Sequence, residues 1–196
     1  MKEYRDYYFK KAKRENYPAR SIYKLLDMDR RLRLFKKGMR VLDLGASPGS
    51  WTLGAAQKVG PEGFVLAVDL KDTDTAFPAW VLFRREDVFA PSLEFTALLE
   101  ERGPFQIVLS DMAPSTTGHK GTDQARSFAL CEQALRVALN CLEKEGALIL
   151  KFFMGPDGEE LSAALRQNFT RVKTLKPAGS RPESKEIFYA ALGFKG

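Results

Sequence analysis

Short apolar runs, rich in Val, Ile, Leu and Phe, recur along the chain from residue 40 to its end. Most are apolar at consecutive positions rather than at alternate ones, which is typical of strands buried on both faces of a sheet. We therefore predict seven strands, at residues 40–44, 64–69, 81–84, 105–110, 147–153, 171–175 and 186–192.

Amphipathic patterns of helical period separate these runs. Between residues 122 and 142 apolar side chains recur at spacings of three, four and seven, and Gly146 follows as a stop signal. Shorter stripes predict helices around residues 93–98 and 161–165. A further stripe predicts a strongly basic helix near residues 20–34.

The alternation of strands and helices predicts an α/β fold, with a mostly parallel seven-stranded sheet and helices on both of its faces. Only residues 176–185 separate the last two strands, which is too few for a helical crossover. The final strand is therefore expected to run antiparallel to its neighbour. Because no internal repeat or low-complexity tract occurs, we expect a single domain over residues 1–196.

Composition excludes several classes of protein. No apolar run approaches the roughly 18 residues of a membrane span, and the N-terminal residues lack the apolar segment of a secretory signal. Cys131 and Cys141 lie on one predicted helix, so we expect two buried thiols in a reducing compartment and no clustered metal site. Since His119 is the one histidine, an enzyme of this sequence would move protons with Lys, Asp and Glu.

Charge is unevenly distributed along the chain. Residues 1–40 hold 14 Lys and Arg against 5 Asp and Glu, a net charge of +9, whereas the remainder has a net charge of −3. A mildly acidic body with a basic N-terminal segment is typical of a protein that contacts nucleic acid. A solubilising charged tail is the alternative.

A glycine-rich turn follows the first predicted strand, at the position where open parallel sheets bind ligands. Residues 41–51 read VLDLGASPGSW, which lacks two of the three glycines of a dinucleotide fingerprint and has no Gly-Lys-Ser/Thr of a P-loop. The segment also fits the G-x-S-x-G pattern of hydrolases. However, Pro48 follows the serine and has no N–H to donate to an oxyanion.

An adenosyl ligand without phosphates fits this turn better. Gly45 and Gly49 allow the backbone to approach a ligand closely. Asp69, at the end of the second strand, can accept hydrogen bonds from both ribose hydroxyls, and Asp87, after the third strand, can accept one from an adenine amino group. These groups meet the needs of S-adenosylmethionine, although each acid alone could be a helix cap or a solvated loop residue.

A lysine interrupts the fifth apolar run, which reads LILKFF and contains Lys151. An ammonium group inside a buried strand is unfavourable unless it is paired or functional. A buried pair with Asp111, which follows the neighbouring strand, is the structural interpretation. A functional lysine of this kind would depend on a shifted pKa.

Several segments together carry a family resemblance: ARSIYKL at 19–25, residues 43–51, SDMAP at 110–114, Lys151 with its preceding leucine, and SRPESKE at 180–186. With them the sequence resembles the FtsJ/RrmJ-type RNA 2′-O-ribose methyltransferases, and specifically the bacterial members that act on large-subunit ribosomal RNA. The family's Lys-Asp-Lys-Glu catalytic tetrad falls on Lys24, Asp111, Lys151 and Glu186. Cofactor contacts carried over by motif fall on Gly49, Trp51, Asp69, Asp87 and Asp111.

Two positions depart from the commonest pattern of the family. Ser50 stands where glycine is frequent, and Ser115 stands where asparagine is frequent. Neither belongs to the tetrad, so these departures bear on substrate preference rather than on the type of reaction.

The resemblance implies a Rossmann-like fold of the S-adenosylmethionine-dependent methyltransferases, with a catalytic core over residues 19–196 and a basic extension over 1–18. The implied reaction is methyl transfer to the 2′-hydroxyl of a ribose, with a uridine expected as the acceptor, in 23S-type ribosomal RNA. We expect Lys151 to accept the hydroxyl proton, Asp111 to orient Lys151, and Lys24 and Glu186 to position the ribose.

The partners implied are ribosomal RNA or the large ribosomal subunit, with no membrane contact, and we expect a cytoplasmic monomer. Methylation of transfer RNA or another RNA, or a non-enzymatic role in ribosome assembly, are the alternatives. The residues expected to neutralise RNA phosphates are Lys10, Lys11, Lys13, Arg14, Arg20 and Arg31.

Overall fold

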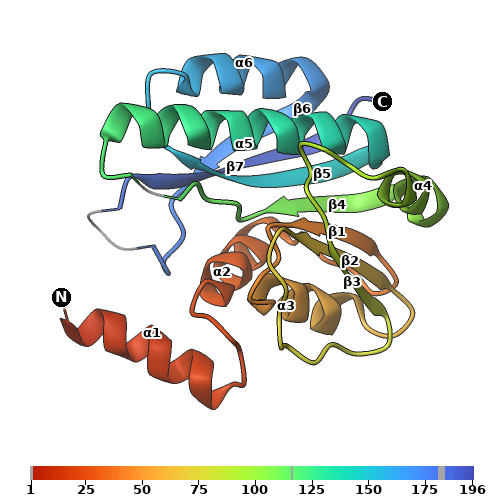
Figure 1. Cartoon of the computed structure of the whole chain (residues 1–196), viewed down its shortest axis with the longest axis horizontal. Helices are drawn as coiled ribbons and strands as arrows, with labels where there is room; N and C mark the ends of the chain where they lie inside the picture. The colour runs from red at the N-terminus through yellow and green to blue at the C-terminus, as the bar shows by residue number, and fades with distance from the viewer. Residues whose placement is uncertain (1, 116, 181–183) are drawn as a thin grey trace.

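The computed structural model describes residues 2–115, 117–180 and 184–196. Its sheet has seven strands in the order β3-β2-β1-β4-β5-β7-β6 (Figure 1). β7 pairs antiparallel with both of its neighbours, and the other pairings are parallel, which confirms the predicted topology. The strands are β1 Arg40–Leu44, β2 Phe64–Asp69, β3 Val81–Arg85, β4 Phe105–Ser110, β5 Leu142–Phe153, β6 Phe169–Leu175 and β7 Glu186–Phe194.

Helices cover both faces of this sheet, as predicted. In Figure 1, α5 and α6 lie above the sheet, and α1, α2 and α3 lie below it. The described helices are α1 Lys2–Arg14, α2 Ile22–Leu32, α3 Ser50–Val59, α4 Leu93–Arg102, α5 Lys120–Cys141 and α6 Gly158–Asn168. No helix within the described ranges is both long enough and apolar enough to span a bilayer.

The sheet divides the hydrophobic core into two clusters, one on each face. Leu42 and Leu44 of β1 point towards α5, whereas Val41, which precedes Leu42, packs with α2 and α3. This alternation follows from the two-residue period of a strand, and because both faces are covered, every one of these positions is apolar. The two cysteines lie on α5, buried and unpaired, and burial raises the pKa of each thiol to about 12.

The structure differs from the predicted elements at the junction of α5 and β5. The helix ends at Cys141, and the strand begins at the next residue rather than at 147. Gly146 therefore lies inside β5 and does not terminate the helix, so that prediction was wrong. Leu142 pairs with Phe105 across a register shift, which starts the strand before the apolar run begins.

The N-terminal segment is helical and docked, which charge patterning alone did not indicate. Ala12 of α1 is 2% exposed and belongs to the same core cluster as α2 and α3. The Tyr8 ring packs against the Tyr23 ring at 5.2 Å, and the Tyr17 hydroxyl donates to Gln57 of α3 at 2.6 Å. The boundary at residue 18 stays a prediction, but the segment before it packs against the residues that follow.

Candidate active site

Lys151, near the end of β5, forms an ion pair with Asp111, just past the end of β4. Its Nζ lies 2.9 Å from Asp111 Oδ1 and also donates to the Asp111 backbone carbonyl. The lysine is 8% exposed, so its ammonium group has exchanged most of its water for these two acceptors. These two contacts fix the orientation of the Lys151 ammonium group as well as pairing its charge.

A second ion pair lies beside the first. Lys24 Nζ of α2 is 2.7 Å from Glu186 Oε1 at the start of β7, and both side chains are about nine-tenths buried. Burial raises the pKa of Glu186, but the charge and hydrogen bond of Lys24 outweigh that effect. With the Ser180 hydrogen bond and the Lys151 charge, they hold the pKa of Glu186 below its ordinary value. Glu186 is therefore ionised at neutral pH.

Strand register brings the two pairs together. Lys151 stands opposite Phe188 in the antiparallel β5–β7 ladder, and Glu186 is two residues before Phe188 on the same face. Lys24 reaches this face from α2, where its Nζ lies 5.7 Å from the centre of the Phe188 ring. The four residues of the sequence-predicted tetrad thus meet at the carboxyl edge of the sheet.

The position of Lys24 depends on contacts between α3 and the start of α2. Ser50 is buried; its Oγ accepts from the Ala19 N–H at 2.6 Å and donates to the Ala19 carbonyl at 3.1 Å. Trp51 donates its indole N–H to the Ser21 carbonyl at 2.9 Å. The serine that departs from the family's frequent glycine therefore anchors the chain just before the helix that carries Lys24, which sequence reasoning missed.

An acidic cavity of about 320 Å³ lies on the Asp111 side of the tetrad. Asp69, Glu86, Asp87 and Asp111 line it together with the Gly45 turn. Gly45 has φ +80°, and a Cβ there would lie 2.6 Å from Met112, so only glycine fits this turn without displacement. Within the described residues, no group of three or more His, Cys, Asp or Glu is placed to hold a metal ion.

The carboxylate of Asp69 shapes the turn that it faces. One oxygen accepts from the Ser47 N–H at 2.9 Å, and the other accepts from the Lys71 N–H at 2.8 Å. Each carboxylate oxygen has a second lone pair, so both can still accept from a ligand hydroxyl. Asp87 accepts from the Phe89 N–H at 2.9 Å and also faces the cavity. This lining suits an extended ligand that carries hydroxyl groups, an amino group and a positive charge.

Two residues expected at the cofactor have other contacts. The Trp51 ring is 2% exposed and packs 5.7 Å from the Phe188 ring, beneath the tetrad rather than in the acidic cavity. Gly49, with φ +106°, lies at the N-terminus of α3, where a Cβ would lie 2.9 Å from the Phe77 ring. Neither is among the lining residues of the acidic cavity, and their contact with a cofactor stays a prediction.

Asp43 of β1 is a further acid near this edge to which sequence reasoning gave no role. It is fully buried and accepts from the Thr52 hydroxyl at 2.7 Å. Burial raises its pKa to about 7; the Thr52 hydrogen bond lowers it, and the charges of Asp111 and Asp69 raise it. An acid inside the apolar run VLDL was the available signal, equivalent to that of Lys151.

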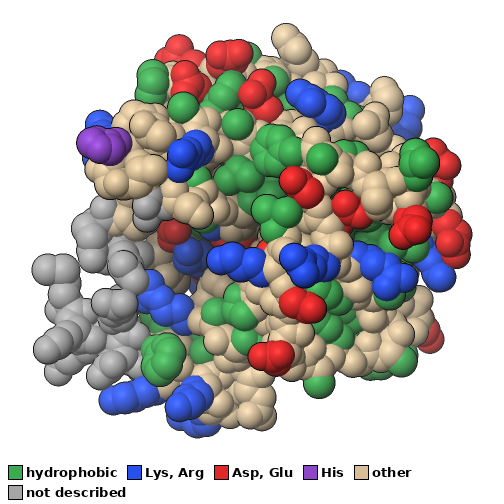
Figure 2. Space-filling model, in the orientation of Figure 1, with side chains coloured by type: hydrophobic (Ala, Val, Ile, Leu, Met, Phe, Trp, Pro, Cys, Tyr) green, Lys and Arg blue, Asp and Glu red, His purple; other side chains and the backbone are tan. Residues whose placement is uncertain are grey.

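The residues expected at RNA phosphates occupy different environments. Lys10, Lys13 and Arg14 are exposed on α1, whereas Lys11 lies 4.7 Å from the centre of the Tyr23 ring. Arg31 pairs with the buried carboxylate of Asp27 at 2.7 Å. Arg20 is partly buried just before α2. Figure 2 shows Lys and Arg side chains around a hollow in this face of the molecule, with acidic side chains inside it.

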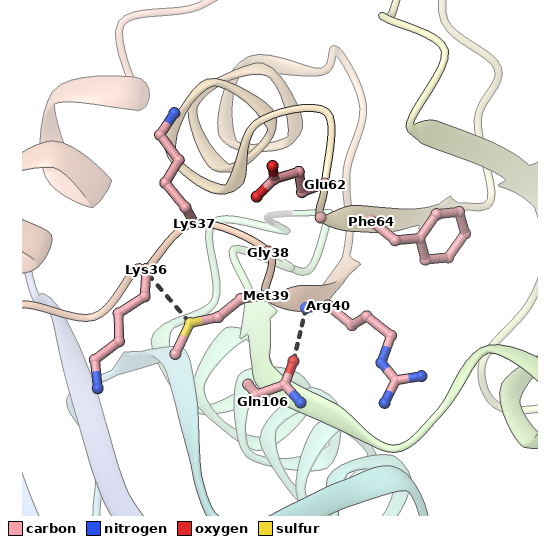
Figure 3. A pocket seen from close by; sticks show the side chains of 9 residues that line it. Lys36, Lys37, Gly38, Met39, Arg40, Glu62, Phe64 and Gln106 are labelled. Atoms are coloured by element: carbon pink, nitrogen blue, oxygen red, sulfur yellow. Dashed lines mark hydrogen bonds between the residues drawn. The ribbon is translucent and has the colours of Figure 1, made fainter.

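The basic segment of residues 1–40 does not form one surface. Its last part, Lys36, Lys37 and Arg40, lines a cavity of about 470 Å³ at the opposite edge of the sheet, where β1, β2 and β4 begin (Figure 3). There the Arg40 N–H donates to Gln106 Oε1 at 2.7 Å. This cavity is the larger one, but it is remote from the tetrad. The cations of α1 and α2 lie on the other part of the molecule, on or beside the helix that carries Lys24.

Comparison with known proteins shows the family of the chain. Residues 17–194 match the model of the FtsJ-like methyltransferase family. The chain is 60% identical over 196 residues to the ribosomal RNA large subunit methyltransferase E of Nitratidesulfovibrio vulgaris strain DP4, covering all of this chain and 96% of that protein. The protein of the same name from Lawsonia intracellularis is 55% identical over 195 residues, covering 100% and 98%.

Solved structures show the same architecture. A structure from Plasmodium falciparum, described provisionally as a ribosomal RNA methyltransferase, superposes with a TM-score of 0.79 at 25% identity, covering 92% of this chain and all of that one. An rRNA-methylase structure from Clostridium thermocellum, also a provisional assignment, shares the fold at a TM-score of 0.60 and 16% identity, covering 87% and 97%. With its tetrad geometry, its seven-stranded sheet and these matches over nearly its whole length, the chain belongs to the FtsJ-like methyltransferase family.

Proposed function

We propose that this methyltransferase uses S-adenosylmethionine to methylate the 2′-hydroxyl of a ribose, with uridine as the expected acceptor, in large-subunit ribosomal RNA. The observation that carries the proposal is the buried Lys151–Asp111 pair, set between an acidic cavity and the Lys24–Glu186 pair. The relatives described above are named ribosomal RNA large subunit methyltransferase E, and this name supports the choice of substrate.

The acidic cavity is the proposed cofactor site. When bound, S-adenosylmethionine supplies a methyl group already activated on a cationic sulfonium. In the proposal, Asp69 accepts from the ribose hydroxyls of the adenosine and Asp87 accepts from its adenine amino group. Asp111 places a negative charge near the positive one. Gly49 and Trp51 would contribute through the backbone, since the Trp51 ring is buried in the core.

Lys151 is the proposed proton acceptor for the 2′-hydroxyl. Its Nζ lies between the acidic cavity, which Asp111 lines, and the Lys24–Glu186 pair. Asp111 holds the amine in a fixed direction through two contacts. Lys24 and Glu186 position the ribose, so the chain supplies orientation and proton removal.

RNA binding is assigned mainly to the exposed cations of α1. Lys10, Lys13 and Arg14 can neutralise phosphates next to the helix that carries Lys24. Lys11, Arg20 and Arg31 remain proposed contacts, although Arg31 would have to share Asp27. An enzyme with this substrate is expected where ribosomes are assembled, which supports the predicted cytoplasmic location. The monomeric state stays a prediction.

Mapping of 2′-O-methylation in total RNA tests the proposal. Cells lacking the protein should lose one ribose methylation in large-subunit ribosomal RNA, and wild-type protein should restore it whereas Lys151→Ala should not. Purified protein should transfer labelled methyl groups from S-adenosylmethionine to large subunits from the deleted cells. Loss of a methylation in transfer RNA, or an unchanged map, would overturn the assigned substrate. Restoration by Lys151→Ala would indicate a non-enzymatic role.

A further inference from the structure

A second cavity adjoins the tetrad on its Glu186 side. Its volume is about 210 Å³, and it lies where β5 ends and β7 begins, against the N-terminal turn of α5. The side chains that line it combine apolar, amide, hydroxyl and charged groups: Lys120, Asp123, Gln124, Phe153, Met154, Ser184, Lys185 and Glu186.

Strand order separates this cavity from the acidic one. The acidic cavity lies over the ends of β2, β1 and β4, whereas this cavity lies over β5 and β7. Asp111 lines the first and Glu186 lines the second, so the two ion pairs of the tetrad stand between them. Displacement at a methyl group requires the donor and the acceptor on opposite sides of the transferred carbon. With the donor in the acidic cavity, the acceptor nucleotide comes from the Glu186 side.

We propose that this cavity holds the base of the acceptor nucleotide, an inference that rests on the proposed function. Phe153 and Met154 supply an aromatic ring and a polarisable thioether against which one base can pack. Gln124 and Ser184 carry donors and acceptors for its edge. Lys120 and Lys185 are exposed at the rim, where the flanking phosphates would pass.

A pocket beside the tetrad fits the way that proteins recognise single nucleotides in RNA. Proteins that recognise RNA by sequence bind single-stranded nucleotides, whose bases have left the stack. A ribose that reaches Lys151 brings its nucleobase with it. The base then needs a site within one nucleotide of the tetrad, and this cavity adjoins Glu186 directly.

Hydrogen bonds between three elements hold the walls of the cavity in place. The Met154 N–H donates to the Lys185 carbonyl at 3.0 Å, and Gln124 Nε2 donates to the Met154 carbonyl. The Phe153 N–H donates to Ser127 Oγ of α5 at 3.0 Å. The pocket is therefore formed before RNA binds, which reduces the entropy lost on binding.

Steady-state kinetics on large subunits from deleted cells test the inference first. Met154→Ala and Phe153→Ala should each raise the KM for subunits about tenfold, as expected for the loss of packing against one base. The Kd for S-adenosylmethionine should not change, and a thermal melt checks that each variant is folded. Lys144→Ala, an exposed change at the other end of β5, is the matched control and should leave both constants unchanged.

Photo-crosslinking identifies the base directly and does not depend on the variants folding. Large-subunit RNA with 4-thiouridine at the mapped acceptor position should crosslink to Phe153 or Met154, and 4-thiouridine two nucleotides away should not. A crosslink from the acceptor position to residues 112–114, or an unchanged KM in both variants, would overturn the inference. If wild-type protein transferred no methyl group to unmodified subunits, the proposed function itself would be wrong and this inference with it.

Discussion

Lys24 Nζ lies 2.7 Å from Glu186 Oε1, and this ion pair connects α2 to the start of β7. The Phe188 ring lies beneath it, 5.7 Å from the lysine nitrogen, and the Trp51 ring packs beside Phe188. Because these aromatic rings shield the ion pair from water, each of its charges is stabilised mainly by the opposite charge of its partner.

Glu186→Gln should destabilise the fold by about 3 kcal/mol at neutral pH, because it leaves the Lys24 ammonium buried without its countercharge. Lys24→Met with Glu186→Gln should recover part of that loss, since neither charge is then buried. Urea unfolding of Glu186→Gln, Lys24→Met, the double variant and wild type measures these effects. A double variant that lost the sum of the two single effects would contradict this coupling.

The same pair predicts how stability depends on acid. The folded-state pKa of Glu186 is below its ordinary value, so its contribution is complete above that ordinary value and is lost as the pH falls through the lower one. The difference in unfolding free energy between wild type and Glu186→Gln should therefore shrink from about pH 6 to about pH 3. A difference that stayed constant over this range would show that the carboxylate is not stabilised by its neighbours.

Asp43 predicts the opposite dependence at higher pH. Its folded-state pKa of about 7 is above the ordinary value of 3.8, so folding favours the protonated acid. This contribution is complete below the ordinary pKa and is lost as the pH rises through about 7. Asp43→Asn should remove that decline in wild-type stability between about pH 5 and about pH 8. The quantity to compare is the slope of unfolding free energy against pH in wild type and variant, because the new amide also changes the hydrogen bonding near Thr52.

Replacement of Lys151 should separate chemistry from cofactor binding. Lys151→Ala removes the proton acceptor, and Lys151→Arg keeps a cation that does not deprotonate in proteins, so both should lower kcat by at least about a hundredfold. Titration calorimetry should show S-adenosylmethionine binding close to that of wild type. Substantial turnover by Lys151→Arg would rule out this residue as the base.

Ser50→Ala should loosen the helix that carries Lys24. The substitution removes the hydroxyl that accepts from Ala19 N–H and donates to Ala19 carbonyl, at an expected loss of about 1–3 kcal/mol in stability. Methyl transfer should fall as well, because Lys24 lies in the first turn of α2, which follows Ala19 closely in the chain. Thr96→Ala, which removes an exposed hydroxyl bond on α4, is the comparison and should change neither property.

The docked α1 changes how its role in RNA binding should be tested. Deleting it would also remove Ala12 and Tyr8 from the packing against α2, so a loss of RNA binding could reflect a damaged core. Lys10→Ala with Lys13→Ala keeps Ala12 and Tyr8 and should lower the salt dependence of RNA binding by about one unit of slope for each lost phosphate contact. Lys36→Ala with Lys37→Ala removes the same charge at the opposite edge of the sheet. An equal effect of the two double variants would show that net charge alone matters.

Much of the fold could be predicted because the strands are buried on both faces. Largely apolar runs at 40–44, 64–69 and 105–110 coincide with β1, β2 and β4, since most positions of such a strand meet a hydrophobic layer. The start of β5 could not be predicted. Residues 143–145 are charged and exposed, and the strand begins at Leu142 because that residue pairs with Phe105 of β4.

The sequence by itself determined the strand alternation and the antiparallel last strand, because the apolar period is a local property of the chain. It also predicted the four residues of the tetrad, through the order of motifs shared with a family. Only the tertiary structure decided that Lys24 pairs with Glu186, that Trp51 supports Phe188 from within the core, and that Ser50 anchors Ala19. It also divided the basic segment between two edges of the sheet. Burial and pairing depend on how distant elements pack against one another, and no local pattern carries that information.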